Sequence, residues 1–114
     1  MKSVEEIFDK YKAIQKKKAE EYSVTEKVIA DFVLHIRNFY KIYDLHEKTN
    51  HSQIFELLFI DKRNLSSESI SQRTYISVKT LYRFKIQYLD FILEAMKNDV
   101  FGDGIGQILT EFFD

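Results

Sequence analysis

The sequence predicts an all-α protein of about five helices, with a helix-turn-helix in its C-terminal half. Helix breakers are scarce, because the 114 residues include no proline and three glycines. Serines that can cap helices stand before the predicted helical segments. Apolar residues recur at steps of three and four, the period of an amphipathic helix. The length suits a single domain over residues 1–114 with one core.

An N-terminal pair of helices is expected over residues 1–47. Ser3 and Glu6 fit a capping box and predict a first helix of roughly 4–21. Its apolar side turns polar at the three lysines 16–18. These lysines suit a solvated helix face better than a basic arm that contacts DNA, because two glutamates follow them directly.

The second helix of the pair is strongly amphipathic. Ser23 and Glu26 form another capping box, which predicts a helix of roughly 24–47. Its apolar stripe is most simply core, although its breadth leaves surface for a dimer interface. The stripe comprises Val28, Ile29, Phe32, Val33, Ile36, Phe39, Tyr40 and Tyr43.

A third helix of about 51–61 opens the unit that contains the helix-turn-helix, residues 51–97. Asn50 and Gln53 are its predicted cap. Its inward residues would pack against the motif as a supporting helix. These are Ile54, Leu57 and Leu58.

Leu65–Phe84 reads as two short helices joined by a tight turn. Ser66 or Ser67 can cap the first helix, and Ser77 can cap the second. Ile70 is expected to point inward from the first helix, as are Leu81 and Phe84 from the second. This spacing is typical of a helix-turn-helix, which lays its second helix in the major groove of DNA. An ordinary helical hairpin is the alternative.

The outward side of the second helix suits DNA. Arg83 can bond guanine bidentately, and Lys79 and Tyr82 can reach bases or phosphate. The stretch from Val78 to Gln87 holds no acidic residue, whereas a merely solvated face would mix in some. The predicted DNA-binding residues are Gln72, Arg73, Ser77, Val78, Lys79, Thr80, Tyr82, Arg83 and Lys85.

Charge is unevenly distributed although the net charge is only −1. Six basic residues and one acidic residue lie between Lys62 and Leu89. Four acidic residues and no basic residue lie between Asn98 and Asp114. A basic patch on the motif is the expected footprint of a phosphate-binding face.

The run Ser77-Val78-Lys79-Thr80-Leu81-Tyr82-Arg83 resembles the serine-capped recognition helix of bacterial regulators related to region four of sigma factors. It is also similar to small phage-encoded activators of the ArpU and RinA type. The resemblance covers about Phe55–Met96 and implies transcriptional control by a phage- or mobile-element-encoded protein. Ser71 replaces the usual alanine. Tyr75 stands where many such motifs have glycine, which predicts a different turn.

The long helix that begins at Val78 meets no breaker until about Lys97. A glycine hinge and a short apolar helix are expected over 98–114, with Asp99 and Asp103 as candidate caps for that last helix. The segment Gly102–Gly106 has no preceding strand and no P-loop lysine, so it is interpreted as a helix stop rather than a phosphate loop.

Two surfaces are candidates for pairing two copies of the chain, since one helix-turn-helix covers few base pairs. One is the stripe of Phe32–Tyr43. The other is Ile105–Phe113 with the end of the long helix. The second is favoured, because a small core is not expected to bury all five of its large apolar residues, namely Ile105, Ile108, Leu109, Phe112 and Phe113.

The function predicted is sequence-specific, DNA-binding transcriptional regulation by a homodimer. The alternative is a helical module that binds a transcription or phage or host protein, such as RNA polymerase. An apolar outward side of Val78–Gln87 would favour the alternative, and a basic and polar side favours DNA.

No feature of the sequence indicates an enzyme, a cofactor or a metal. Cysteine is absent, and His35, His46 and His51 form no i, i+4 pair, so a zinc site is disfavoured. The carboxylates suggest no pocket for acid–base chemistry. The first residues are too acidic for a signal peptide, and no apolar run approaches the ~20 residues of a membrane span. A cytoplasmic protein is expected.

Overall fold

The computed structural model describes the backbone of residues 2–100, 102 and 104–113 and the side chains of residues 4–100, 102 and 104–110. In this part of the chain no residue lies in a β-strand and six α-helices are present, so the all-α prediction is confirmed. The elements are α1 (Lys2–Ile14), the 3₁₀ turn η1 (Ala19–Glu21), α2 (Val24–Glu47), α3 (His51–Phe55), the π turn η2 (Glu56–Ile60), α4 (Ser67–Thr74), α5 (Val78–Lys97) and α6 (Ile105–Phe113).

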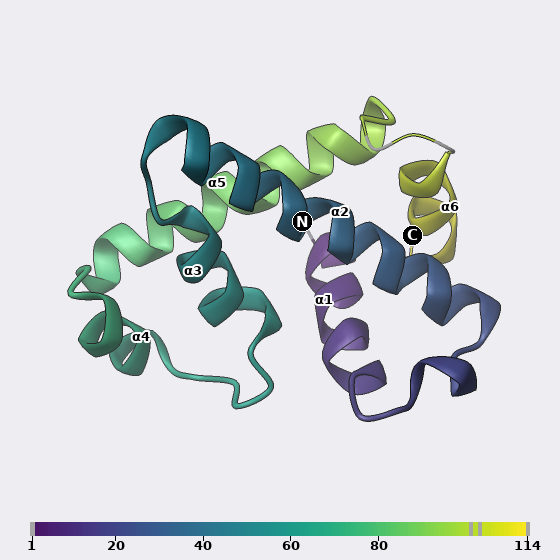
Figure 1. Cartoon of the computed structure of the whole chain (residues 1–114), viewed down its shortest axis with the longest axis horizontal. Helices are drawn as coiled ribbons and strands as arrows, with labels where there is room; N and C mark the ends of the chain where they lie inside the picture. Colours follow the sequence, from purple (N-terminus) through teal and green to yellow (C-terminus); the bar gives the residue numbers. More distant parts are fainter. Residues whose placement is uncertain (1, 101, 103, 114) are drawn as a thin grey trace.

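Helix α5 links two groups of helices (Figure 1). It contacts α4 near its beginning and α6 near its end, and it also contacts α1. Helices α1, α2 and α6 pack against one another, and α3 with η2 lies between this group and α4. None of the helices in the described part is both long and apolar enough to cross a membrane.

Phe55 lies at the centre of one continuous core. Its side chain is fully buried, and its ring contacts rings from α1, α2, η2 and α5. The centroid distances are 5.6 Å to Phe8, 5.1 Å to Tyr40, 5.3 Å to Phe59 and 6.0 Å to Tyr88. Most of the predicted α2 stripe joins the same core, with Ile29, Phe32, Val33, Ile36 and Tyr40 buried.

Helix α1 is shorter than predicted, and its start differs by two residues. It ends at Ile14 rather than near residue 21, and Ser3 lies inside it rather than at its N-cap. The chain leaves the helix in a turn at residues 15–17, and the connection that follows brings α2 against α1. Lys17 Nζ donates to Glu26 Oε2 over 2.9 Å across this connection. The polar stretch predicted as helix is therefore mostly a connection.

Helix α2 begins and ends as predicted. The Ser23 hydroxyl accepts from the Glu26 backbone N–H, and the Glu26 carboxylate accepts from the Ser23 backbone N–H, so the predicted capping box is confirmed. These two bonds satisfy donors that the first turn of a helix leaves without partners.

The third helix buries other residues than predicted. After α3 the helix widens into the π turn η2, and this wider turn changes which positions along the chain face the core. Leu57 and Leu58, predicted to point inward, are half-buried, whereas Phe55, Phe59 and Ile60 are buried.

The predicted cap at Asn50 is wrong, because its side chain makes no capping hydrogen bond. Asp44 from the end of α2 takes that role. Its carboxylate accepts from the backbone N–H groups of His51 at 2.8 Å and Ser52 at 2.7 Å, and from the Thr49 hydroxyl at 2.6 Å. A carboxylate here also complements the positive N-terminal end of the helix dipole.

Acid should destabilise this fold through its capping carboxylates. Burial alone would raise the pKa of Asp44, but hydrogen bonds from Thr49, Ser52 and His51 outweigh it and lower that pKa. Bonds from the Ser23 backbone and from Lys17 likewise lower the pKa of Glu26. A lowered folded-state pKa gives stability that is present above about pH 4 and lost as the pH falls through the folded value.

We therefore expect the free energy of unfolding to be level from pH 7 to about pH 5 and to fall below about pH 4. Asp44→Asn should cost about 1 kcal/mol at pH 7, as loss of a helix cap does, and less at pH 3, because protonation of this aspartate in the unfolded state has begun to remove its contribution there. Urea unfolding of both proteins at the two pH values measures this. An equal difference at pH 7 and pH 3 would contradict it.

The C-terminal segment completes the core of the single chain. Gly102 and Gly104 have φ values of 82° and 66° and form the predicted break, but Gly106 lies inside α6 rather than in the hinge. Ile105 and Leu109 are buried, so two of the five residues assigned to a dimer surface face this core instead. Ile108 is 39% exposed, and the side chains of Phe112 and Phe113 lie outside the described residues.

Asp99 contributes to the start of α6 as predicted. Its Oδ2 accepts from the backbone N–H of Gly104 over 3.3 Å, one residue before the helix begins. Asp103, the other candidate cap, lies outside the described residues.

Candidate nucleic-acid interface

Helices α4 and α5 occupy the segment for which the sequence predicts a helix-turn-helix. Ser66 caps α4 by accepting from the Ser69 backbone N–H, and Ser77 caps α5 by accepting from the Thr80 backbone N–H. Three residues separate the helices. The buried side chains of Ile70 and Leu81 anchor them to the core, as predicted for the inward sides of this pair.

The turn between the two helices has a left-handed residue at its start. Tyr75 has φ 59° and ψ 26°, and its backbone N–H donates to the Ser71 carbonyl over 2.9 Å. Thr74 tightens the same turn, because its hydroxyl donates to the Ile70 carbonyl and accepts from the Ile76 backbone N–H. This is the backbone that glycine often adopts at helix ends, and here a tyrosine adopts it.

Lys79, Tyr82 and Arg83 come together on the exposed side of the first turns of α5. Tyr82 is 64% exposed, and both basic side chains are exposed as well. Residues 79 and 83 are one helical turn apart, so their charges lie along one line on the helix surface. The arrangement presents two cations and a phenol in the way predicted from the sequence.

A partly apolar row runs beside these basic residues. Val78 is 40% exposed and Ile86 is 37% exposed, and both lie one turn from Tyr82 along the helix. The outward side of α5 is therefore mixed rather than purely basic and polar. Beyond Gln87 the exposed residues include the acidic Asp90 and Glu94, so the basic character is confined to the N-terminal half.

The cations of this face are not engaged in ion pairs. Among the described residues, Arg73, Lys79 and Arg83 have no carboxylate within the 4.0 Å of a salt bridge. By contrast, Arg63 pairs with Asp61 at 2.6 Å. Lys79 and Arg83 are therefore available to an external anion such as a phosphate, whereas Arg73 also acts on Asp61 and helps to lower its pKa.

The other predicted site residues do not all lie on the same exposed face. Gln72 and Arg73 are exposed at the end of α4. The Thr80 hydroxyl accepts from the Ser77 hydroxyl at 3.0 Å and from Arg83 Nη2 at 3.4 Å, so it orients Arg83.

Lys85 lies on a different side of α5, toward α1. Its Nζ is 3.8 Å from Glu5 Oε1, and it borders a small hollow that also includes side chains from α1 and η2. Its assignment to DNA stays a prediction, although its surroundings are less favourable to phosphate than those of Lys79.

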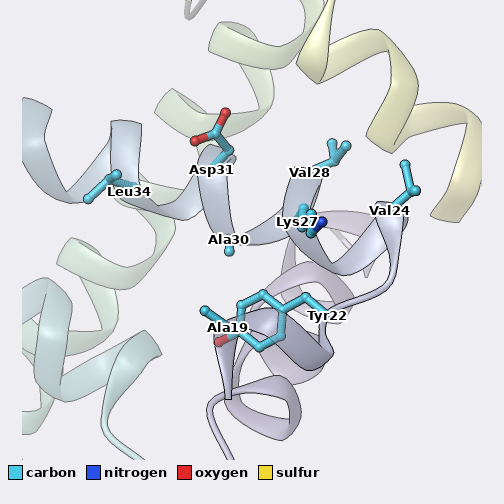
Figure 2. Close-up of a pocket in the computed structure, with 8 residues that line it drawn as sticks. All are labelled: Ala19, Tyr22, Val24, Lys27, Val28, Ala30, Asp31 and Leu34. Carbon is cyan, nitrogen blue, oxygen red and sulfur yellow. The ribbon is translucent and has the colours of Figure 1, made fainter. Parts of the chain in front are cut away.

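A shallow hollow of about 540 Å³ lies between η1 and α2. Figure 2 shows the residues that line it. Tyr22 and Ala19 lie on one side of α2, while Asp31 points away from the Tyr22 ring. Val24 and Leu34 at its edge are 80% and 50% exposed. The polar groups do not converge on one point, so the hollow lacks the geometry of a catalytic site.

A second hollow of about 360 Å³ lies between α2, α3 and α5 and is almost wholly aromatic. His51 Nδ1 is hydrogen-bonded to the Tyr88 hydroxyl at 2.7 Å within its wall. Its lining residues are Phe39, Tyr40, Tyr43, His51, Gln87, Tyr88 and Phe91. Over the described residues, no group of three or more His, Cys, Asp or Glu side chains could hold a metal ion.

Sequence reasoning missed the left-handed Tyr75 and the position of Lys85. The sequence did contain a signal for Tyr75, since an aromatic residue stands there in place of the glycine expected at this turn. It contained no signal for Lys85, because the packing of α1 determines the surroundings of that side chain.

Comparison with known protein families, curated protein sequences and solved structures finds no match for this chain.

Proposed function

We propose that this protein binds double-stranded DNA through the N-terminal half of α5 and regulates transcription. One observation supports this above the others. Lys79, Tyr82 and Arg83 are exposed together on the first turns of a serine-capped helix, joined to α4 by a three-residue turn. A helix presented in this way fits the major groove, where its first residues meet the base edges.

Each residue has a distinct role in this proposal. Arg83 reads a base edge, since a guanidinium matches the two acceptors of guanine. Lys79 and Tyr82 contact a base or a phosphate beside it. Gln72 and Arg73 at the end of α4 contact phosphates, which position a protein on DNA without reading its sequence.

Arg83→Ala should weaken binding to a preferred duplex by ~1–3 kcal/mol and relax base preference at one or two positions. Lys97→Ala is the matched control, because it removes one positive charge from the other end of the same helix. The control should leave affinity and preference nearly unchanged. Selection from a random duplex library, followed by fluorescence anisotropy on the enriched sequence, measures both effects.

The salt dependence provides a further test within the same series. Affinity should fall as salt rises, because phosphate contacts release counterions. Lys79→Ala should reduce the slope of log affinity against log salt by about 1 if it neutralises a phosphate. The absence of any enriched sequence, together with no binding at low salt, would rule out the proposal.

A protein-interaction module is the second candidate, and the exposed row of Val78, Tyr82 and Ile86 favours it. Aromatic and aliphatic side chains on one helix face are suited to a groove on a partner protein, such as RNA polymerase. In that case Tyr82→Ala and Ile86→Ala should abolish capture of the partner, while Arg83→Ala should have little effect. The proposed DNA function predicts that Arg83 matters most.

Pairing of two copies in the cytoplasm is part of the proposed function, since DNA half-sites are usually read by dimers. The predicted C-terminal surface loses Ile105 and Leu109 to the core. The outer side of α2 also exposes apolar side chains, with Leu45 at 83% and Ile42 at 66%. Light scattering at micromolar concentration distinguishes a dimer from a monomer.

A further inference from the structure

Tyr75 is held in a backbone conformation that is unfavourable for its residue type. At φ 59° it ends α4 in the left-handed region, where a side chain crowds the following carbonyl. Glycine avoids this crowding, and asparagine and aspartate tolerate it better than aromatic residues do. Strained residues of this kind persist where the surrounding structure or the function requires them.

The side chain of Tyr75 gains nothing inside the molecule to offset that strain. It is 96% exposed, and within the described part of the chain its ring contacts no other ring and its hydroxyl makes no hydrogen bond. Two of the three other left-handed non-glycine residues in the described part of the chain differ in this respect, whereas Lys48 at the end of α2 is exposed and its side chain makes no such bond. Asn64 Oδ1 accepts from Lys12 Nζ at 2.9 Å, and Asp99 Oδ2 accepts from Gly104. The fold therefore uses the backbone of Tyr75 and leaves its phenol unused.

The position of this phenol points to DNA. Tyr75 precedes the Ser77 cap of α5 by two residues, and in the chain it lies between the cations of Arg73 and Lys79. If the first turns of α5 enter the major groove, a side chain on the preceding turn lies at the groove edge. The phosphate backbone runs along that edge, and tyrosine hydroxyls are among its donors.

We propose that the Tyr75 hydroxyl donates a hydrogen bond to a DNA phosphate beside the groove that α5 enters. This inference rests on the proposed function and deepens it. A neutral donor positions the protein on the duplex without releasing a counterion. Its removal weakens binding to all sequences alike and leaves the salt dependence unchanged.

Two substitutions at Tyr75 separate the effect of its hydroxyl on binding from the effect of its backbone strain on stability. Tyr75→Phe keeps the left-handed backbone with its strain and removes only the hydroxyl. We expect a ~3–10-fold loss of affinity, equal for preferred and unrelated duplexes, with the thermal midpoint unchanged to within about 1 °C. Tyr75→Gly relieves the strain as well, so the thermal midpoint should rise by about 2–5 °C while affinity falls at least as far.

Tyr22→Phe is the matched control, because it removes a tyrosine hydroxyl from the connection before α2, outside the residues proposed to bind DNA or a second copy, and it should change neither property. Anisotropy titrations with a duplex selected by the wild type, over a series of salt concentrations, give affinity and slope. Thermal unfolding followed by circular dichroism gives the midpoint.

The outcomes separate the inference from the function on which it rests. Wild-type binding that Tyr75→Phe leaves unchanged would overturn the inference and leave the proposed function intact. A loss confined to one duplex sequence would overturn the phosphate assignment, since it would indicate a base contact. Failure of the wild type to bind any duplex at low salt would overturn the proposed function first and the inference with it.

Discussion

Gly106→Ala should lower the thermal midpoint by about 8–15 °C, equivalent to about 2–3 kcal/mol for a domain of this size. Gly106 lies inside α6, where alanine would ordinarily be favoured. Here a Cβ would come within 2.6 Å of the Met96 carbonyl oxygen and 2.7 Å of its Cα. These are backbone atoms of α5, so no side-chain rotation relieves the overlap, and the two helices must separate.

Gly104→Ala is the matched control for this effect. It adds the same methyl group two residues earlier, where nothing lies within 4 Å, and it costs only the strain of its positive φ of 66°. We expect a loss of about 1 kcal/mol there. Differential scanning calorimetry on both variants makes the comparison. Equal losses in the two variants would show that the crossing of α5 and α6 tolerates a side chain.

Phe55→Ala should reduce the free energy of unfolding by about 3–5 kcal/mol. The side chain is fully buried and joins rings from four other elements, so its removal leaves a cavity that no single element can close. A loss of this size approaches the whole stability of many small domains, which is about 5–15 kcal/mol. Urea unfolding followed by circular dichroism measures it.

Phe55→Leu and Phe91→Ala show whether the centre of the core is correctly assigned. Phe55→Leu keeps most of the apolar volume and should cost less than half as much. Phe91 is half-buried and stacks on Phe39 at 4.6 Å, so its replacement by alanine should cost about 1–2 kcal/mol. A larger effect at Phe91 than at Phe55 would place the centre of the core elsewhere.

The sequence predicts most of the candidate interface because α5 is regular. Once Ser77 begins the helix, the helical period alone brings Lys79 and Arg83 to one side and sends Leu81 to the other. It does not predict Lys85 equally well, because the ion pair with Glu5 depends on where α1 packs. Nor does it predict that the Tyr75 side chain is exposed and makes no ring contact or hydrogen bond within the described part of the chain, because this depends on which residues surround it.

By itself the sequence determined the helical class and the bounds of α2 and α5. These depend on local interactions: the serine caps at Ser23 and Ser77 act within one helical turn, and no proline interrupts either helix. The tertiary structure decided the end of α1, the cap of α3 and the role of Gly106. Each depends on contacts that reach beyond one helix, since Lys17 contacts Glu26, Asp44 contacts His51, and α6 crosses α5 at Met96. A pattern of neighbouring residues cannot predict such contacts, because they form only when the helices pack against one another.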